Sequence, residues 1–184
     1  MTDYGDYPGL EELIAFHGHM CPGLALGYRA VAAALEQLGV VRSADEELIA
    51  IVENDSCSVD AAQFLAGTTF GKGNLFFRDW GKQVFTLARR DSSEAVRVAL
   101  RTGAMEAPAA AAAGDETAAR QLKIDHILSA PDAELFDIRK TAAELPPRAV
   151  IRRSLVCEGC GEPVMETRTV DLDGKRLCLG CAAD

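Results

Sequence analysis

The chain has 184 residues, 48% of them hydrophobic and 26% charged, with a formal net charge of −9. This length suits one globular domain with a small appendage, and the negative charge argues against binding nucleic acid or an anionic membrane through bulk electrostatics. No apolar run approaches the roughly 20 residues of a membrane span, and the acidic start is no secretory signal. We therefore expect a cytoplasmic protein, in which clustered cysteines more often bind metal than form disulfides.

The first third of the chain predicts three helices and one buried strand. An apolar pattern over residues 10–17 predicts a short helix, and three- and four-residue apolar steps predict a longer one over 22–38. Proline at the start of that longer helix and Gly39 at its end suit these positions. The continuous apolar run 48–52 predicts a buried strand. A helix from about residue 57 or 58 to 65 is expected to follow.

The remainder of the core predicts a hairpin and several helices. Residues 75–77 and 83–87 are typical of strands, and the turn residues 79–82 between them favour a hairpin. Further helices are predicted over 95–100, 109–113, 118–128 and 133–143. Trp80 is interpreted as a core or dimer contact rather than a ligand-stacking residue, as is Phe85. His126 is interpreted as a surface or structural histidine.

The sequence favours two domains. Pro146-Pro147 ends the helical pattern, so we place an α+β core at 1–145 and a small cysteine-rich domain at 150–184. Three arginines, Arg148, Arg152 and Arg153, are interpreted as part of a solvated linker. Residues 150–156 and 165–170 are typical of strands, and Asp173-Gly174 predicts a tight turn before 175–177.

Four cysteines of the tail predict a zinc site. Cys157 and Cys160 form one pair, and Cys178 and Cys181 form another after seventeen intervening residues. Two thiolate pairs at this spacing suit a tetrahedral, closed and therefore structural zinc site of the zinc-ribbon or treble-clef type. A rubredoxin-like iron site and redox-active thiols are the alternatives. Because the tail is too small to bury a useful core, metal binding is expected to supply on the order of 10 kcal/mol of its folding free energy.

A second candidate site lies in the core. His17, His19 and Cys21 fall within five positions between two predicted helices, and a thiol at a helix N-terminus has a lowered pKa. Imidazole and thiolate both bind zinc and related transition metals. Cys57 follows the predicted buried strand, where α/β proteins often place functional groups. The alternatives are a glycine-rich turn with capping histidines, and a Cys57 that is merely buried.

Three segments resemble the FmdE family, which is named for a component of formylmethanofuran dehydrogenase: FHGHMCPG at 16–23, ENDSCSVDAAQ at 53–63 and GKGNL at 71–75. The tail segment CEGCGEPVME at 157–166 resembles the zinc-finger extension of many members. The resemblance covers essentially the whole chain. It implies an α+β core of helices on a mixed β-sheet, an intertwined homodimer, and association with a molybdenum or tungsten oxidoreductase.

The resemblance also implies a metal-binding cleft. The matching residues are His17, His19, Cys21 and Cys57, with Asp60 and Gln63 nearby. Lys72, Asn74 and Lys82 also belong to matching segments, and we interpret them as hairpin residues rather than cleft-lining groups.

Two functions of different class follow from these features. The first is a metal-binding accessory or subunit-like protein, with zinc in the tail, a second zinc or other transition metal in the core, and a tail that docks a partner. The second is a metal-dependent enzyme or redox protein acting on a small formyl or one-carbon substrate, with Cys57, Cys21 and His19 as the candidate catalytic residues. The chain has no complete catalytic triad, phosphate loop or dinucleotide fingerprint, so the sequence favours the first.

Overall fold

The computed structural model describes residues 9–106 and 115–183, and the helix expected over 109–113 lies outside them. The chain divides into two compact units, one ending at Arg148 and the other beginning at Ala149. Within the described ranges, no helix has both the length and the apolar character needed to cross a membrane.

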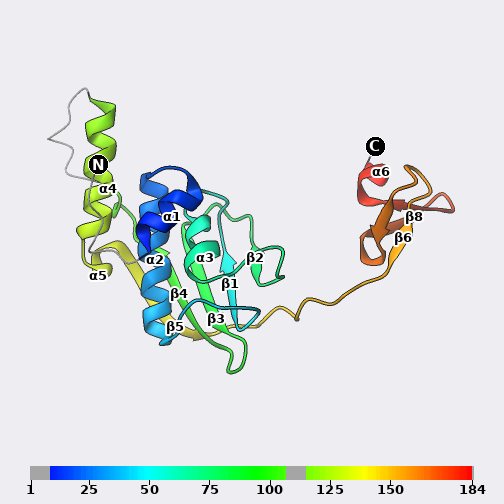
Figure 1. Cartoon of the computed structure of the whole chain (residues 1–184), viewed down its shortest axis with the longest axis horizontal. Helices are drawn as coiled ribbons and strands as arrows, with labels where there is room; N and C mark the ends of the chain where they lie inside the picture. The colour runs from blue at the N-terminus through cyan, green and yellow to red at the C-terminus, as the bar shows by residue number, and fades with distance from the viewer. Residues whose placement is uncertain (1–8, 107–114, 184) are drawn as a thin grey trace. The chain divides into compact units, whose positions relative to one another are not determined.

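The N-terminal unit is built on one five-stranded mixed sheet (Figure 1). Its spatial order is β2-β1-β3-β4-β5. Strands β1 and β2 are parallel, and the other three neighbouring pairs are antiparallel. The strand bounds are β1 Leu48–Val52, β2 Leu75–Phe77, β3 Val84–Arg89, β4 Glu94–Leu100 and β5 Phe136–Ala142.

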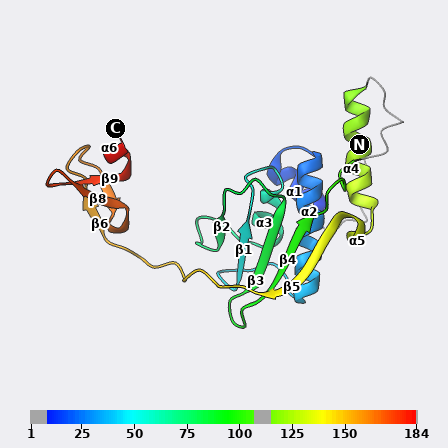
Figure 2. The same ribbon diagram turned by 180° about the vertical axis from the view of Figure 1, so that it is seen from behind.

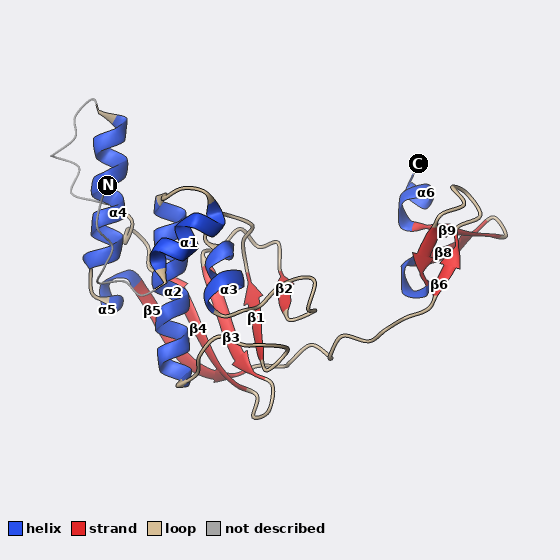
Figure 3. Cartoon of the chain, viewed as in Figure 1, coloured by secondary structure: helices blue, strands red, loops and turns tan. Residues whose placement is uncertain are grey.

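Helices cover one face of this sheet (Figure 3). They are α1 Leu10–His17, α2 Pro22–Leu38 and α3 Val59–Leu65, with α4 Glu116–Ser129 packed against α2 and the short α5 Asp132–Leu135 leading into β5. The hydrophobic core joins buried side chains of these helices to alternate residues of the strands, including Val52, Phe85 and Val98. This helix-on-sheet arrangement is the predicted α+β class.

The long helix α2 begins and ends as the sequence predicts. Cys21 is its N-cap and accepts a hydrogen bond at Sγ from the backbone N–H of Leu24, 3.3 Å away. Pro22 occupies the first turn, where its missing N–H has no partner to lose. Gly39 ends the helix at φ 63°, in the left-handed region that glycine adopts freely.

Three predictions for the core are wrong. Strands β2 and β3 form no hairpin, because β1 lies between them and pairs with both. Residues 95–100 form strand β4 rather than a helix, since their β-branched residues alternate and the antiparallel neighbours β3 and β5 provide partners on both sides. The helix expected over 133–143 is limited to its first turn, after which the chain continues as β5.

Two aromatic residues differ in their surroundings. Phe85 is 1% exposed and belongs to the core, whereas Trp80 is 54% exposed. The prediction that Trp80 is a core residue is therefore wrong for this chain on its own. His126 is half-buried, with Nε2 3.1 Å from the carbonyl oxygen of Ala104, and the structural interpretation is confirmed.

The C-terminal unit consists of two small hairpins and a terminal helix. Strands β6 Ser154–Val156 and β7 Pro163–Met165 pair with each other, as do β8 Thr169–Leu172 and β9 Lys175–Cys178. A 3₁₀ turn, η2 Glu166–Arg168, joins the two hairpins, and α6 Leu179–Ala183 follows. The predicted turn Asp173-Gly174 is confirmed, with φ values of 50° and 76° that suit a tight hairpin.

Candidate metal centres

Two groups of side chains within the described residues are close enough to hold a metal ion. One is His17, Cys21 and Cys57 in the N-terminal unit; the other is the set of four cysteines in the C-terminal unit. In each group the ligand atoms all lie within 4.8 Å of one another. Zinc bonds of about 2.0–2.3 Å to nitrogen and sulfur allow one ion to reach atoms at such separations.

The core group is assembled from three separate elements. His17 is the last residue of α1, Cys21 caps α2, and Cys57 lies in the loop between β1 and α3. Glycine makes this approach possible, because a Cβ at Gly23 would lie 3.3 Å from Cβ of Cys57 and 3.8 Å from Sγ of Cys21. The packing of α2 against α3 therefore brings together two thiols that are 36 positions apart in the chain.

Asp60 orients the histidine of this group. Its Oδ2 lies 2.6 Å from Nδ1 of His17, and its Oδ1 accepts a hydrogen bond from Nε2 of Gln63 at 3.0 Å. A hydrogen bond to the carboxylate places the imidazole proton on Nδ1 and leaves the lone pair on Nε2. Metal-binding histidines in proteins are commonly held by a carboxylate in this way.

The second nitrogen of His17 supports a metal at this place. Nε2 is buried and has no hydrogen-bond partner among the residues that the structure describes. A buried polar atom without a partner is costly, and a cation beside it would remove the cost. Burial and the neighbouring Cys21 thiol raise the pKa of Cys57. The donor set of one imidazole and two thiols fits zinc or a similar transition metal.

His19, the fourth residue predicted for this site, is placed differently. It is exposed and lies outside the three-residue group, with its ring centroid 4.7 Å from that of His17. Lys72 and Asn74 lie at a loop instead. Nζ of Lys72 donates to the Asp45 carbonyl at 3.2 Å, and Nδ2 of the buried Asn74 donates to the Leu48 carbonyl at 3.0 Å.

One polar network near Cys57 was not predicted from the sequence. Oδ1 of buried Asn54 accepts hydrogen bonds from the hydroxyls of Ser56 and Ser58 at 2.8 and 3.1 Å. Nε2 of Gln83 donates to the Ser56 hydroxyl at 3.1 Å, and Nδ2 of Asn54 donates to the Lys82 carbonyl at 3.0 Å. The spacing Asn-x-Ser-x-Ser was the available signal, because such side chains commonly bond nearby backbone and hydroxyl groups in turns. This network fixes the loop that carries Cys57.

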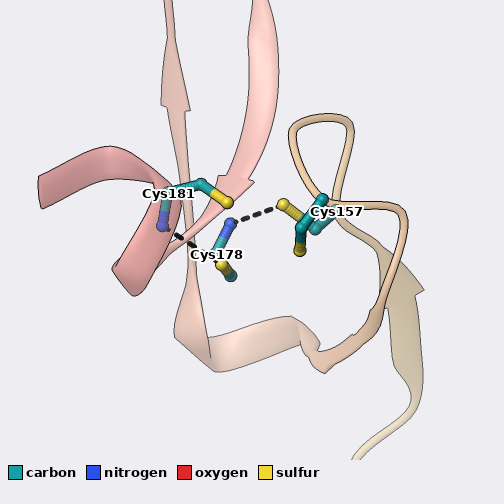
Figure 4. Close-up of side chains that lie close together, drawn as sticks. Cys157, Cys178 and Cys181 are labelled. Atoms are coloured by element: carbon teal, nitrogen blue, oxygen red, sulfur yellow. Dashed lines mark hydrogen bonds between the residues drawn. The ribbon is translucent and has the colours of Figure 1, made fainter. Parts of the chain in front are cut away.

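The tail cysteines also come from different elements (Figure 4). Cys157 and Cys160 flank a turn after β6, Cys178 ends β9, and Cys181 lies in α6. The backbone N–H of Cys178 donates to Sγ of Cys157 at 3.2 Å, and that of Cys181 donates to Sγ of Cys178 at 3.3 Å. Amide donors directed at sulfur are typical of the surroundings of metal-bound thiolates.

The thiols of the tail differ in acidity. Backbone N–H groups of Cys160 and Cys178 lower the pKa of Cys157 to about 6. The neighbouring thiols Cys178, Cys160 and Cys157 raise the pKa of Cys181 to about 12, because a second negative charge so near is unfavourable. A divalent cation would neutralise that repulsion, so four clustered cysteines fit a cation better than four free thiols.

Comparisons with known proteins agree with both units. Residues 16–137 match the family model described as "FmdE, Molybdenum formylmethanofuran dehydrogenase operon". Residues 151–184 match the prokaryotic dksA/traR C4-type zinc finger. The tail thus carries a zinc finger of the four-cysteine type, as predicted.

Two relatives extend these matches. An FmdE-like protein of tungsten formylmethanofuran dehydrogenase, from Syntrophus aciditrophicus, has a similar crystal structure, with a TM-score of 0.66 and 26% identity, covering 94% of this chain and 89% of that one. A protein of Archaeoglobus fulgidus named "Probable S-adenosyl-L-methionine-binding protein" is 33% identical over 91% of this chain. The match spans 50% of that curated relative, so the chain corresponds to about half its length.

Proposed function

The chain belongs to the FmdE family, and from this premise we propose that it is a metal-binding accessory or subunit-like protein. Its core binds zinc or a related transition metal through His17, Cys21 and Cys57. The observation that carries this proposal is the buried, unpartnered Nε2 of His17 beside two thiols, with Nδ1 held by Asp60.

The core centre differs from the tail centre in its number of ligands. Three protein ligands leave one position open, as in catalytic or exchangeable zinc sites, whereas four cysteines close the shell. The exposed His19, beside His17, lines the open position. A small ligand, or a side chain from a partner, would complete the coordination there.

Cobalt(II) reconstitution tests the core site. Thiolate-to-cobalt absorption reports sulfur ligation directly, so a chain whose four tail cysteines are replaced by serine is predicted to keep a signal that arises from Cys21 and Cys57. Adding Cys57→Ser should then weaken or remove the absorption, while Ser56→Ala, a change of a neighbouring hydroxyl, should leave it. If the tail-free chain shows no sulfur-to-cobalt band, the core is no metal site.

The tail is proposed as the docking element for a larger partner, of the molybdenum or tungsten oxidoreductase class, and the chain as a homodimer. Several apolar side chains of the zinc finger are exposed, which is unusual enough in so small a unit to favour contact with a protein: Val156, Met165, Leu172 and Leu179. Sedimentation of the full chain tests the dimer. Reconstitution with the purified oxidoreductase, with and without Leu172→Asp, tests the docking.

A second candidate function is supported by the open position itself. In this alternative the chain is a metal-dependent enzyme or redox protein for a small formyl or one-carbon substrate. A bound metal would supply a bound water of lowered pKa or a polarised carbonyl, and the chain's own groups would orient the substrate. Turnover of formyl compounds that is lost in Cys57→Ser would favour this alternative; absence of turnover by the metal-loaded chain favours the accessory role.

A further inference from the structure

The sheet face that turns away from α1, α2 and α3 carries a charged hollow, and Figure 2 shows the sheet from that side. Ile51, Thr86 and Arg97 are paired across β1, β3 and β4, so they share one face. Their sequence neighbours Val52, Phe85 and Val98 belong to the core on the opposite, helix-covered face.

The hollow has a volume of about 390 Å³, a size that accommodates a small metabolite. Its charged and aromatic lining is Glu53, Arg78, Trp80, Lys82, Arg97 and Glu144. None of these residues belongs to either metal centre.

Glu53 is the group that points to a ligand. It is 4% exposed, and only one of its two carboxylate oxygens is paired: Oε1 lies 3.4 Å from Nη2 of Arg97. Oε2 is buried without a hydrogen-bond partner within residues 9–106 and 115–183. Leaving a charged oxygen unsatisfied costs more than leaving a neutral one. A donor supplied by a bound molecule would remove this cost.

The opposite charge gathers around the same hollow. Trp80 is half-exposed, with Cζ of Arg78 5.1 Å and Nζ of Lys82 5.5 Å from its ring centroid. With the partly exposed Arg97, these make three cations in a chain whose net charge is −9. Three cations against two carboxylates leave the hollow able to take an anion, while Glu53 still needs a donor.

We propose that this hollow binds a small zwitterion of the α-amino-acid type. The ammonium group donates to Oε2 of Glu53, the carboxylate pairs with Arg97 or Lys82, and the side chain of the ligand rests against the indole of Trp80. A simple anion would satisfy the cations and leave Glu53 unpaired, and a simple amine would do the reverse. Only a molecule with both groups matches the whole lining. This inference goes beyond the metal-binding function and is independent of it.

Intrinsic fluorescence tests the proposal directly, because Trp80 is the only tryptophan of the chain. The full-length protein is titrated with each common amino acid and, for any that binds, with the matching carboxylic acid that lacks the α-amine. We expect a saturable change with at least one amino acid, and binding at least about tenfold weaker for its deaminated analogue, since a charge-assisted hydrogen bond contributes about 1.5–3 kcal/mol.

Variants separate this site from general charge effects. Glu53→Gln and Arg97→Gln are each expected to weaken binding about tenfold or more. Arg139→Gln is the matched control. Arg139 pairs with Arg97 across β4 and β5, but its side chain is 71% exposed and lies outside the hollow, so its loss should change affinity less than about twofold. Calorimetry on Arg97→Gln provides an independent measure if Glu53→Gln does not fold.

Three results would overturn the proposal. These are no saturable change with any amino acid, equal affinity for an amino acid and its deaminated analogue, or equal weakening by Arg139→Gln and Arg97→Gln. Because Cys57→Ser leaves this lining intact, it is expected to bind the amino acid as the wild type does. Loss of metal binding in the core would therefore leave the outcome of this test unchanged.

Discussion

Oδ2 of Asp60 lies 2.6 Å from Nδ1 of His17, although the two residues are 43 positions apart in the chain. The carboxylate comes from the first turn of α3 and the imidazole from the last residue of α1. This pair leaves the other imidazole nitrogen free and buried next to Cys21 and Cys57. The packing of α1 on α3 therefore prepares one ligand for a metal before any metal binds.

Asp60→Asn is predicted to weaken metal binding in the core. The amide retains the shape of the carboxylate but removes the charge that orients the imidazole and makes it more basic, and loss of such a partner lowers metal affinity by about 10- to 100-fold. Competition with a chelator, on chains whose tail cysteines are replaced by serine, measures the change. Asp55→Asn, at an exposed carboxylate of the same loop, is the control and should leave the affinity unaltered.

Gly27→Ala is predicted to destabilise the N-terminal unit by about 1–3 kcal/mol. A Cβ at this position would lie 2.7 Å from Cα of Ser58, so α2 and the start of α3 would have to separate. Because Cys21 and Cys57 meet across the same contact, core metal affinity should fall together with the unfolding free energy. Chemical denaturation measures the first effect. Gly71→Ala, where a Cβ meets nothing within 4 Å, should alter neither quantity.

Gly159→Ala is predicted to weaken zinc binding in the tail. The added Cβ would lie 3.2 Å from Sγ of Cys181 and 3.1 Å from Cδ2 of Leu177, closer than most side-chain contacts. Strain of about 1–3 kcal/mol corresponds to roughly a 5- to 150-fold loss of affinity. A zinc-chelator titration of the tail site tests this. Gly180→Ala introduces only an ordinary contact, 3.8 Å from Sγ of Cys178, and an affinity equal in the two variants would refute the explanation.

Glu47 is predicted to make stability depend on acid pH. Hydrogen bonds from the Ser43 hydroxyl and the Asp45 backbone N–H lower its pKa from 4.5 to about 2. Since the folded-state pKa lies below the unfolded one, its contribution is fully present above about 4.5 and is lost as the pH falls towards 2. The difference in unfolding free energy between wild type and Glu47→Gln should be constant from pH 5 to 7 and shrink below pH 4.5. A difference that grew on acidification would contradict this account.

Local signals explain which elements the sequence predicted. Helix α2 has a capping residue at Cys21, a proline in its first turn and Gly39 at its end, so its bounds follow from adjacent residues. Strands β4 and β5 lack such signals. Ala95 and Ala99 are as suited to a helix as to a strand, and only the pairing with β3 and β5 decides.

The candidate site divides in the same way. The four tail cysteines are predictable because their spacing alone brings two thiol pairs to one ion. The core group is a different case, since the contact between α2 and α3 at Gly27 and Ser58 determines whether Cys57 reaches Cys21. Nothing in the local sequence distinguishes His17, which is held by Asp60, from its exposed neighbour His19.

The central claim is that the core holds its own metal, and metal content per chain tests it most directly. It is measured for the wild type, for a chain with all four tail cysteines replaced by serine, and for that chain with Cys57→Ser added. The two clusters predict two equivalents, then one, then none or a weakly held remainder. One equivalent in the wild type and none in the tail-free chain would contradict the claim, because the tail alone would then account for the metal.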